Sequence, residues 1–389
     1  MTNNKDKKVL NVLNLRFPEF TGEWKKCIIG ELTIKVGSGV TPRGGETVYK
    51  SEGHPFVRSQ NVGLGHLILD DIAYIDEDTH QRQKNTELQL DDVLLNITGA
   101  SIGRSALVNQ QIVGGNVNQH VCIIRANKKL IPSFLCNFLL SQYGQKQIES
   151  FQAGGNRQGL NFEQIKSIKI GLPSVEEQKK IADLLLLIEQ RITTQNKIIE
   201  DLKKLKSAIY QELFSNLQGE KKSLSELAEI TKGQQVNGNQ LNENGKYYVM
   251  NGGIMPSGYY DDYNTEAGTI SISEGGNSCG YVQYNKSKFW SGGHCYTLHI
   301  KPTARISTLF LFHFLKWKEE DIMRLRIGSG LPNIQKKDLS KVRIIVPTFD
   351  KQQRLIALLS TLQMKIEYEE MYTINLDKQK LHLLSQMFI

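Results

Sequence analysis

Glycine-containing loops rich in Arg, Asn, Gln, Ser and Lys recur along the 389-residue chain, and these side chains can read the edges of DNA bases. Arg offers a fork to the two acceptors of guanine, Asn and Gln match the donor and acceptor of adenine, and glycines let the backbone approach phosphates. In the first half the candidate DNA-binding residues are Arg43, Arg58, Gln60, Asn61, Thr98, Ser101, Arg104, Asn118, Asn156 and Arg157. In the second half they are Lys232, Gln234, Gln235, Asn251, Asn277, Ser278, Tyr281, Arg326 and Ser329. An ordinary solvated turn explains any one of them at least equally well, so the hypothesis rests on recurrence in both halves.

Motifs of the common catalytic sites are missing from the sequence. It contains no G-x-x-x-x-G-K-[ST] phosphate loop, no G-x-S-x-G elbow and no H-E-x-x-H zinc helix. The Asn-Pro-Pro-aromatic or Asp-Pro-Pro-aromatic tetrapeptide expected of an adenine methyltransferase is missing too. Glu177 and Lys179 resemble a nuclease pair, but acidic residues that start a long helix are better explained by the helix dipole. His120 and His294 are more typical of structural histidines, so we expect no catalytic residue, metal or cofactor in this chain.

The composition is that of a globular chain of two or three domains. Lys and Arg number 48 against 40 Asp and Glu, a mild basic excess compatible with a polyanionic partner. The five cysteines form no C-x-x-C pair, which argues against a disulfide framework or a structural zinc site. The N-terminus lacks a signal-peptide pattern, and no apolar run approaches the roughly 18 residues of a membrane span. We therefore expect a cytoplasmic protein with no membrane contact.

The chain contains an internal repeat. The segment PSVEEQKKIADLLLLIEQRI from Pro173 matches PTFDKQQRLIALLSTLQMKI from Pro347, a shift of 174 residues. Continued upstream, the same shift pairs Phe138 with Phe312. Near the start of each half the shift is 195, so the first half carries about 21 more residues before its helix. Such insertions fall in loops, where recognition specificity usually lies.

The segment after each proline is predicted to be a long helix. Apolar residues alternate in steps of four and three from Ile181 to Leu213 and again from Leu355 to Met387, which is the heptad pattern of a coiled coil. Polar residues such as Gln195 and Lys206 interrupt the seam and would fix its register. Each helix could simply pack on its own domain. We favour an antiparallel pairing of the two helices, which would make them a spacer between two globular units.

The segments before the helices combine short apolar runs, such as DVLLNI and GTISIS, with glycine-containing turns. Helices are expected from Ile131 and, at the equivalent place, from Ile306. The predicted fold class is α+β, with two globular domains that are each followed by a long helix. The expected parts are an N-terminal arm (1–23), a first domain (24–173), a central helix (174–218), a second domain (219–347) and a C-terminal helix (348–389).

The sequence resembles the specificity (S) subunits of type I restriction-modification enzymes over nearly its whole length. The resemblance lies in LRFPEFTGEW, GSGVTP, LLNITGASIGR, LPSVEEQKKIADLL and its repeat VPTFDKQQRLIALLS. The proline-x-x-x-x-Gln entry to each helix is the most specific element. The second repeat departs slightly, because Lys351 stands where the first has Glu177, and its globular domain is shorter.

The resemblance implies a non-catalytic subunit whose two target recognition domains each bind one half of a bipartite, asymmetric sequence in double-stranded DNA. It also implies two methyltransferase (M) subunits, which methylate adenine with S-adenosylmethionine, and optionally two restriction (R) subunits, which cleave DNA with ATP and Mg. The M-binding surface is expected on outward helix faces, for instance at Lys179, Lys180, Lys197, Lys203 and Lys204. Two rival classes stay open at this point: an enzyme that cuts or methylates DNA alone, and a coiled-coil scaffold that binds no nucleic acid.

Overall fold

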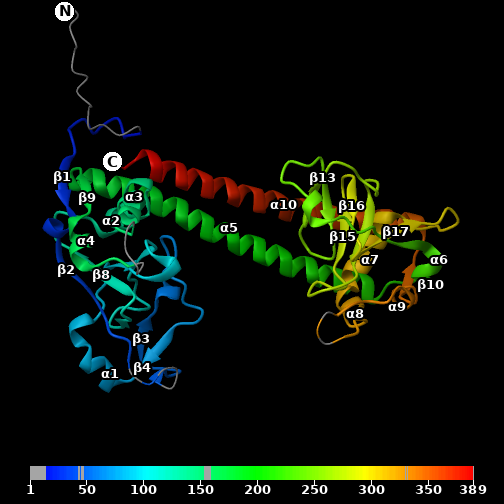
Figure 1. The fold of residues 1–389 in the computed structure, drawn as a ribbon, viewed down its shortest axis with the longest axis horizontal. Helices are drawn as coiled ribbons and strands as arrows, with labels where there is room; N and C mark the ends of the chain where they lie inside the picture. The colour runs from blue at the N-terminus through cyan, green and yellow to red at the C-terminus, as the bar shows by residue number, and fades with distance from the viewer. Residues whose placement is uncertain are drawn as a thin grey trace, which may run out of the picture. The chain divides into compact units, whose positions relative to one another are not determined.

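The computed structural model describes residues 15–42, 44, 48–152, 159–328, 330 and 332–388. It divides into two compact units, each drawn in Figure 1. Unit 1 comprises the chain up to Asn196 together with the chain from Met371 onward, and unit 2 comprises Lys197–Glu370. Four candidate DNA-binding residues lie outside the described residues: Arg43, Asn156, Arg157 and Ser329.

The described residues of unit 1 form three small sheets. A four-stranded sheet has the order β2-β8-β5-β6, a three-stranded sheet the order β4-β3-β7, and β1 pairs with β9. Its elements are β1 (Lys25–Ile28), β2 (Thr33–Ser38), β3 (His54–Val57), β4 (Ala73–Ile75), α1 (Glu77–Arg82), β5 (Val93–Asn96), β6 (Ser105–Leu107), β7 (Asn116–Val117), β8 (Val121–Ala126), α2 (Pro132–Leu140), α3 (Gln142–Ser150), α4 (Phe162–Ser167) and β9 (Lys169–Leu172). Short strands joined by glycine-rich turns fit the alternating apolar pattern of the sequence.

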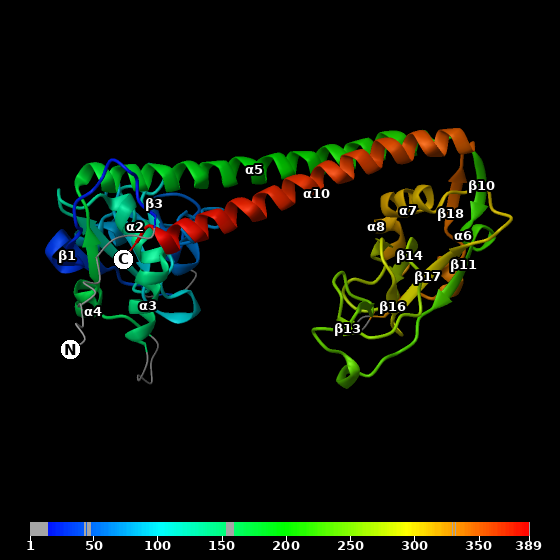
Figure 2. The same cartoon turned by 90° about the horizontal axis from the view of Figure 1, so that it is seen from above.

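Unit 2 repeats this plan, with sheets β11-β17-β14-β15, β13-β12-β16 and β10-β18 (Figure 2). Its elements are β10 (Glu220–Ser223), α6 (Leu224–Leu227), β11 (Ala228–Lys232), β12 (Tyr247–Met250), β13 (Gly258–Tyr260), β14 (Thr269–Ser273), β15 (Val282–Asn285), β16 (Phe289–Ser291), β17 (Cys295–Ile300), α7 (Thr308–Trp317), α8 (Glu319–Met323), α9 (Lys336–Leu339) and β18 (Arg343–Val346). Even the mixed pairing recurs, since β3 and β12 each have one antiparallel and one parallel neighbour. The expected α+β repeat is therefore confirmed.

The helices α2 and α7 correspond with a shift of 176, not the 174 expected from the sequence. Phe134 and Phe138 pack against Phe388 in unit 1, as Phe310 and Phe314 pack against Phe214 in unit 2. The expected helix from Ile131 is also broken in two. The break lies at Ser141, whose hydroxyl accepts a hydrogen bond from the amide of Gly144 (3.2 Å) and caps α3.

The two long helices are α5 (Val175–Ser215) and α10 (Phe349–Gln386). A buried glutamine in the first turn ties each helix to its own globular unit. The side chain of Gln178 accepts from the Ile131 amide (2.8 Å) and donates to the Lys129 and Pro173 carbonyls (3.0 and 3.1 Å). Gln352 makes the same three hydrogen bonds, to Ser307, Arg305 and Pro347. The entry motif of the sequence is thus a buried hydrogen-bonded clamp.

Within each unit the two helices lie antiparallel. In unit 1, Glu189 of α5 forms an ion pair with Lys380 of α10, and Arg191 stacks on the ring of Tyr372. In unit 2, Lys206 of α5 donates to Gln363 of α10 (2.6 Å), and Lys203 forms an ion pair with Glu370. In both units, residue numbers rise along α5 while those of the α10 residues that they contact fall. The antiparallel pairing is therefore confirmed, and neither helix packs on its own domain alone.

Each globular core is completed by the end of a long helix. The core of unit 1 contains Leu384 from the end of α10, together with Met387 and Phe388 directly after it. The core of unit 2 contains Tyr210 and Phe214 from the end of α5. The second half of the chain therefore contributes to the stability of unit 1 through apolar burial.

Candidate nucleic-acid interface

Equivalent loops form a polar rim at the strand ends of each unit. We define rim 1 as residues 97–104, 118–120 and 159, and rim 2 as residues 274–281, 292–294 and the described part of 327–333. Isolated bridges join the first and last segments at Thr98–Gly159 in rim 1 and Gly275–Asn333 in rim 2. Each first segment turns on two left-handed glycines, at Gly99 and Gly103 (φ 76° and 86°) in rim 1. Their counterparts Gly276 and Gly280 have φ values of 79° and 95°.

Rim 1 is held together by hydrogen bonds among its polar residues. The hydroxyl of Thr98 lies 2.5 Å from Nδ1 of His120, whose backbone amide donates to the Asn118 side chain (3.0 Å). The hydroxyl of Ser101 accepts from the Asn96 side chain (3.1 Å). Asn118 is buried and Arg104 is exposed. Thr98, Ser101 and Asn118 therefore set the shape of the rim, while Arg104 is presented to solvent.

The loop after β3 presents a second cationic group. The Arg58 guanidinium donates to the side chain and backbone of Asp71 (2.9 and 2.7 Å), and Gln60 donates to the same carboxylate (2.6 Å). Asn61 is 1% exposed, and its side chain donates to the Ile68 carbonyl and accepts from the Arg58 amide. Asn61 thus positions Arg58, and a base contact by Asn61 itself would require the loop to open.

A charged cluster lies at rim 2 around Glu274, a residue that the sequence pattern did not indicate. Glu274 is 9% exposed and accepts from Lys232 (2.6 Å) and from the Tyr296 hydroxyl (3.0 Å). Its second carboxylate oxygen lies 3.7 Å from Nδ1 of His294 and has no hydrogen-bond partner among the described residues. Burial and the neighbouring carboxylate raise the pKa of Tyr296. Strand pairing places Ile97 and Cys122 at the equivalents of Glu274 and Tyr296, so the two rims differ in charge.

The remaining candidates of unit 2 are mixed in exposure. Ser278 donates to the Gly252 carbonyl (2.6 Å), and the Asn251 side chain accepts from the His294 amide (3.0 Å), so both stabilise the rim. Tyr281 lies beneath the ammonium of Lys316, which is 4.0 Å from its ring centroid. The exposed candidates are Lys232, Gln234, Gln235, Asn277 and Arg326. The described loops of unit 2 therefore present a cation and amides together, the side chains suited to base edges and phosphates.

Two further features bear on the class of protein. Among the described residues, no group of three or more His, Cys, Asp or Glu is placed to hold a metal ion. No helix in the described part of the chain is both long and apolar enough to cross a membrane.

The chain contains two related α+β units, and each has a polar rim and packs on part of one antiparallel helix pair. This organisation is typical of a recognition protein with two binding domains. The family model described as "Type I restriction modification DNA specificity domain" matches residues 21–204 and 217–376. The chain therefore belongs to this family. Both copies of the family domain span a globular unit and most of the helix that follows it.

Individual relatives agree with the family. The chain is 35% identical over 157 residues to S.MpnORF638P of Mycoplasma pneumoniae, named as a type I specificity subunit, but the match spans only 42% of that protein. It is 22% identical to the MjaX specificity subunit of Methanocaldococcus jannaschii, over 93% of this chain and 92% of that one. The crystal structure of the type I S subunit from M. genitalium has the same fold, with a TM-score of 0.64, 19% identity and coverage of 97% and 99%.

Proposed function

We propose that this chain is the DNA-reading subunit of a type I restriction-modification complex, and that each rim reads one half of a bipartite target. The observation that carries the proposal is the pair of rims, which share a backbone plan and differ in side chains. Such a pair suits the reading of two different half-sites by one chain. The target recognition domains in this proposal are residues 24–173 and 219–347, flanked by the arm (1–23) and the helices (174–218 and 348–389).

In the proposed mechanism, different side chains supply the affinity for DNA and the specificity for its sequence. Exposed Lys and Arg side chains contact phosphates and supply affinity that depends on salt but not on sequence. Exposed side chains in the rims, such as Arg104 and Asn277, and directly beside rim 2, such as Arg326, then discriminate base edges in the major groove, at about 1–3 kcal/mol for each good bidentate contact. The chain itself performs no methyl transfer and no cleavage.

Chemistry is supplied by partners. In the proposed complex two M subunits methylate adenine with S-adenosylmethionine, and optional R subunits cleave DNA with ATP and Mg. A solved structure similar in fold to this chain (TM-score 0.59, 18% identity) is described as the structural basis of complex assembly in the type I system, which supports a multi-subunit state. We place the complex in the cytoplasm.

The M-binding surface is proposed on the helices, but the expected lysines are weak candidates for it. Lys180, Lys203 and Lys204 form ion pairs with Glu19, Glu370 and Glu200 of the same chain. Large apolar side chains on the same helices are exposed instead: Leu186, Leu187, Ile198, Leu205, Leu358, Met364, Tyr368, Met371, Ile374 and Leu381. Exposed apolar residues on helices are typical of a protein-docking face.

Methylation mapping by long-read sequencing tests the reading function. A host that carries the gene together with its M gene should show a bipartite methylated motif that vanishes when this gene is deleted. Exchange of residues 219–347 for those of a relative should change one half of the motif and leave the other half intact. Methyl transfer by the purified chain alone would support the rival enzyme class, and an unchanged methylome on deletion would support the scaffold class.

The helix pair is proposed to fix the gap between the half-sites. Half-sites about one helical turn apart, some 34–36 Å, suit a protein with two target recognition domains. Insertion of one heptad into both helices, beside Ile192 in α5 and at the facing position of α10, should change the gap and keep both half-sites. Altered half-sites with an unchanged gap would contradict the spacer role.

A further inference from the structure

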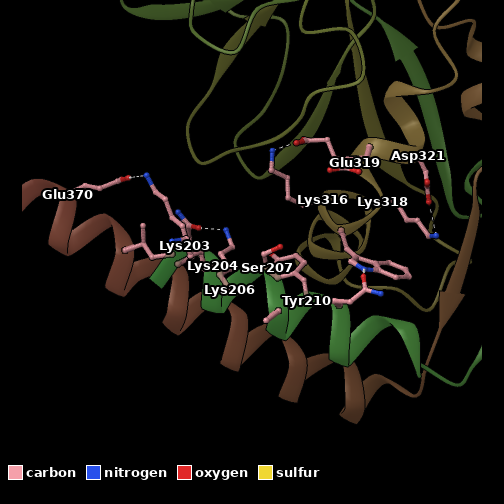
Figure 3. A pocket seen from close by; sticks show the side chains of 16 residues that line it. Lys203, Lys204, Lys206, Ser207, Tyr210, Lys316, Lys318, Glu319, Asp321 and Glu370 are labelled. Carbon is pink, nitrogen blue, oxygen red and sulfur yellow. Dashed lines mark hydrogen bonds and ion pairs between the residues drawn. The ribbon is translucent and has the colours of Figure 1, made fainter. Parts of the chain in front are cut away.

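Unit 2 contains a cavity of about 1030 Å³ between its part of the helix pair and the α7–α8 segment. Its walls include Lys206, Ser207 and Tyr210 from α5, Gln363 from α10, and Lys316 and Trp317 from α7. Figure 3 shows Lys206, Ser207 and Tyr210 on one side of the cavity and Lys316 on the other. The rims do not use this cavity, and the cavity lies wholly within unit 2.

Unit 1 fills the corresponding place with its own chain. Residues 63–66, which we name the filler loop, lie between the helix pair and the four-stranded sheet. The ammonium of Lys380 donates to the Leu64 carbonyl (3.2 Å) and pairs with Glu189, and His66 lies 3.4 Å from the same carboxylate. The backbone amide of Gly65 donates to the Ser105 carbonyl (2.9 Å). A lysine of the helix seam is thus satisfied by a carboxylate and by a loop carbonyl.

Unit 2 lacks the filler loop. The hairpin that carries it spans residues 58–72 between β3 and β4, whereas the matching connection between β12 and β13 spans only 251–257. The carbonyl of Val282, which corresponds to that of Ser105, accepts from Lys316 (3.1 Å) instead of from a loop amide. The cavity is therefore the space that the filler loop occupies in unit 1.

The charge balance of the cavity also differs from that of unit 1. Lys206 is the equivalent of Lys380, but it donates to the neutral amide of Gln363 (2.6 Å), which stands where unit 1 has Glu189. Burial, together with the charge of Lys316, lowers the pKa of Lys206. The other lysines of the cavity each have a carboxylate partner: Lys203 with Glu370, Lys204 with Glu200, Lys316 with Glu319 and Lys318 with Asp321. Unit 2 has thus lost both the loop and the carboxylate that satisfy this lysine in unit 1.

We propose that the cavity binds a carboxylate-bearing loop of a partner polypeptide, with the carboxylate on Lys206 and an adjacent side chain against Tyr210 and Trp317. The filler loop shows that a polypeptide fits this place. A nucleic acid backbone fits less well, because the cavity is also lined by Glu319, Glu320, Asp321 and Glu370, which repel a polyanion but tolerate one carboxylate. The partner is the M subunit, an assignment that rests on the proposed function.

Substitutions of Gln363 and Lys206 test the proposal through their effect on M binding. Gln363→Glu places a carboxylate of the chain itself beside Lys206, as Glu189 lies beside Lys380 in unit 1, and it gives up the hydrogen bond that the Gln363 amide donates to Glu367 (3.0 Å). The carboxylate of the partner then has no free cation to bind, so the affinity of the chain for M should fall. Lys206→Gln should weaken M binding about tenfold, the loss expected for one charge-assisted hydrogen bond, and Lys206→Arg should retain most of the affinity. Lys204→Gln, in the same cavity on an exposed and already paired lysine, is the matched control and should bind M normally.

The measurement is the affinity of the purified full-length chain for M, together with photo-crosslinking from p-benzoylphenylalanine at position 207 in the assembled complex with DNA. A crosslink to an Asp- or Glu-containing segment of M supports the proposal. A crosslink to DNA or to the chain's own N-terminal arm overturns it, as does unchanged affinity in both Lys206→Gln and Gln363→Glu. Neither substitution touches a rim, so a normal bipartite methylome alongside these negative results would leave the proposed function standing.

Discussion

At the scale of single residues, a buried histidine in unit 2 makes stability depend on pH. Nδ1 of His313 lies 2.6 Å from the Tyr210 hydroxyl, and burial, with the charge of Lys206 adding to it, lowers the pKa of His313 to about 4. In the unfolded chain the pKa of this His is near 6.5. Between pH 6.5 and pH 4 the unfolded chain therefore binds a proton at His313 that the folded chain does not bind. Stability is therefore full above pH 6.5 and falls as the pH drops toward 4.

We expect unit 2 to lose about 2 kcal/mol of unfolding free energy from this residue between pH 7 and pH 5. His313→Asn, which installs the residue found at the equivalent Asn137 of unit 1, keeps an acceptor for Tyr210 and removes the titration. Urea unfolding of the full-length chain, monitored by hydrogen exchange in unit 2 at both pH values, measures the difference. Identical pH dependence in the variant and the natural chain would show that His313 does not titrate as argued.

A second residue prediction concerns the charged cluster of rim 2. Glu274→Gln keeps the shape of the side chain but releases the charge that holds Lys232 (2.6 Å). The half-site read by unit 2 should become less specific by about 1–3 kcal/mol, because a mobile lysine discriminates bases poorly. Methylation mapping should show one relaxed half and one unchanged half. Arg104→Gln in rim 1 is the counterpart, and it should relax the other half; relaxation of both halves by either change would contradict separate reading.

The sequence predicted the rim loops but not the roles of their side chains. Polar residues among glycines at recurring places singled out Arg104 and Asn277 as DNA-binding candidates, and both side chains are exposed. The same pattern was not enough to separate these residues from Asn61 and Asn118, which are buried. Burial depends on contacts between distant segments, so spacing along the chain does not reveal it. Glu274 carried one usable signal, a charged residue directly after the uncharged strand Thr269–Ser273.

At the scale of elements, the glutamine clamp connects each long helix to its globular unit. Gln178 and Gln352 are fully buried, and each makes three hydrogen bonds to backbone groups. Gln178→Leu should leave an amide and two carbonyls without partners and lower the unfolding free energy of unit 1 by about 3 kcal/mol. Gln352→Leu should do the same in unit 2. Hydrogen exchange, measured separately in unit 1 and unit 2, tests both predictions. If Gln178→Leu lowered the stability of unit 2, or Gln352→Leu that of unit 1, the clamp would be contradicted.

Long helices were the elements that the sequence predicted best, because a heptad seam gives many concordant residues. Shorter helices were predicted less well. The helix expected from Ile131 is interrupted where Ser141 adopts an extended backbone and caps the next helix. The equivalence of α2 and α7 was displaced by two residues, since similarity in that region is weak and only the aromatic contacts to Phe388 and Phe214 fix it.

At the scale of the whole molecule, the repeat in the sequence predicted two similar units but not how the chain is divided between them. Unit 1 takes its last core residues from the end of the chain, and unit 2 takes Tyr210 and Phe214 from the end of α5. A heptad pattern indicates that two helices pair, but it does not show which globular core receives each helix end. That assignment depends on the antiparallel arrangement, in which each helix begins on one unit and ends on the other.

The division of the chain leads to a prediction about Phe388, which is 5% exposed and packs its ring 5.2 Å from that of Phe134. Phe388→Ala should lower the unfolding free energy of unit 1 by about 3–5 kcal/mol, the usual cost of removing a buried Phe side chain. Although the change lies at the C-terminus, hydrogen exchange should rise in residues 93–140 and stay unchanged in residues 228–345. Phe214→Ala is the matched variant and should do the reverse.

In the methylome, each variant should weaken the half-site of the unit that it destabilises. Loss of the half-site read by unit 2 from Phe388→Ala would show that the segment after the C-terminal helix stabilises unit 2 instead.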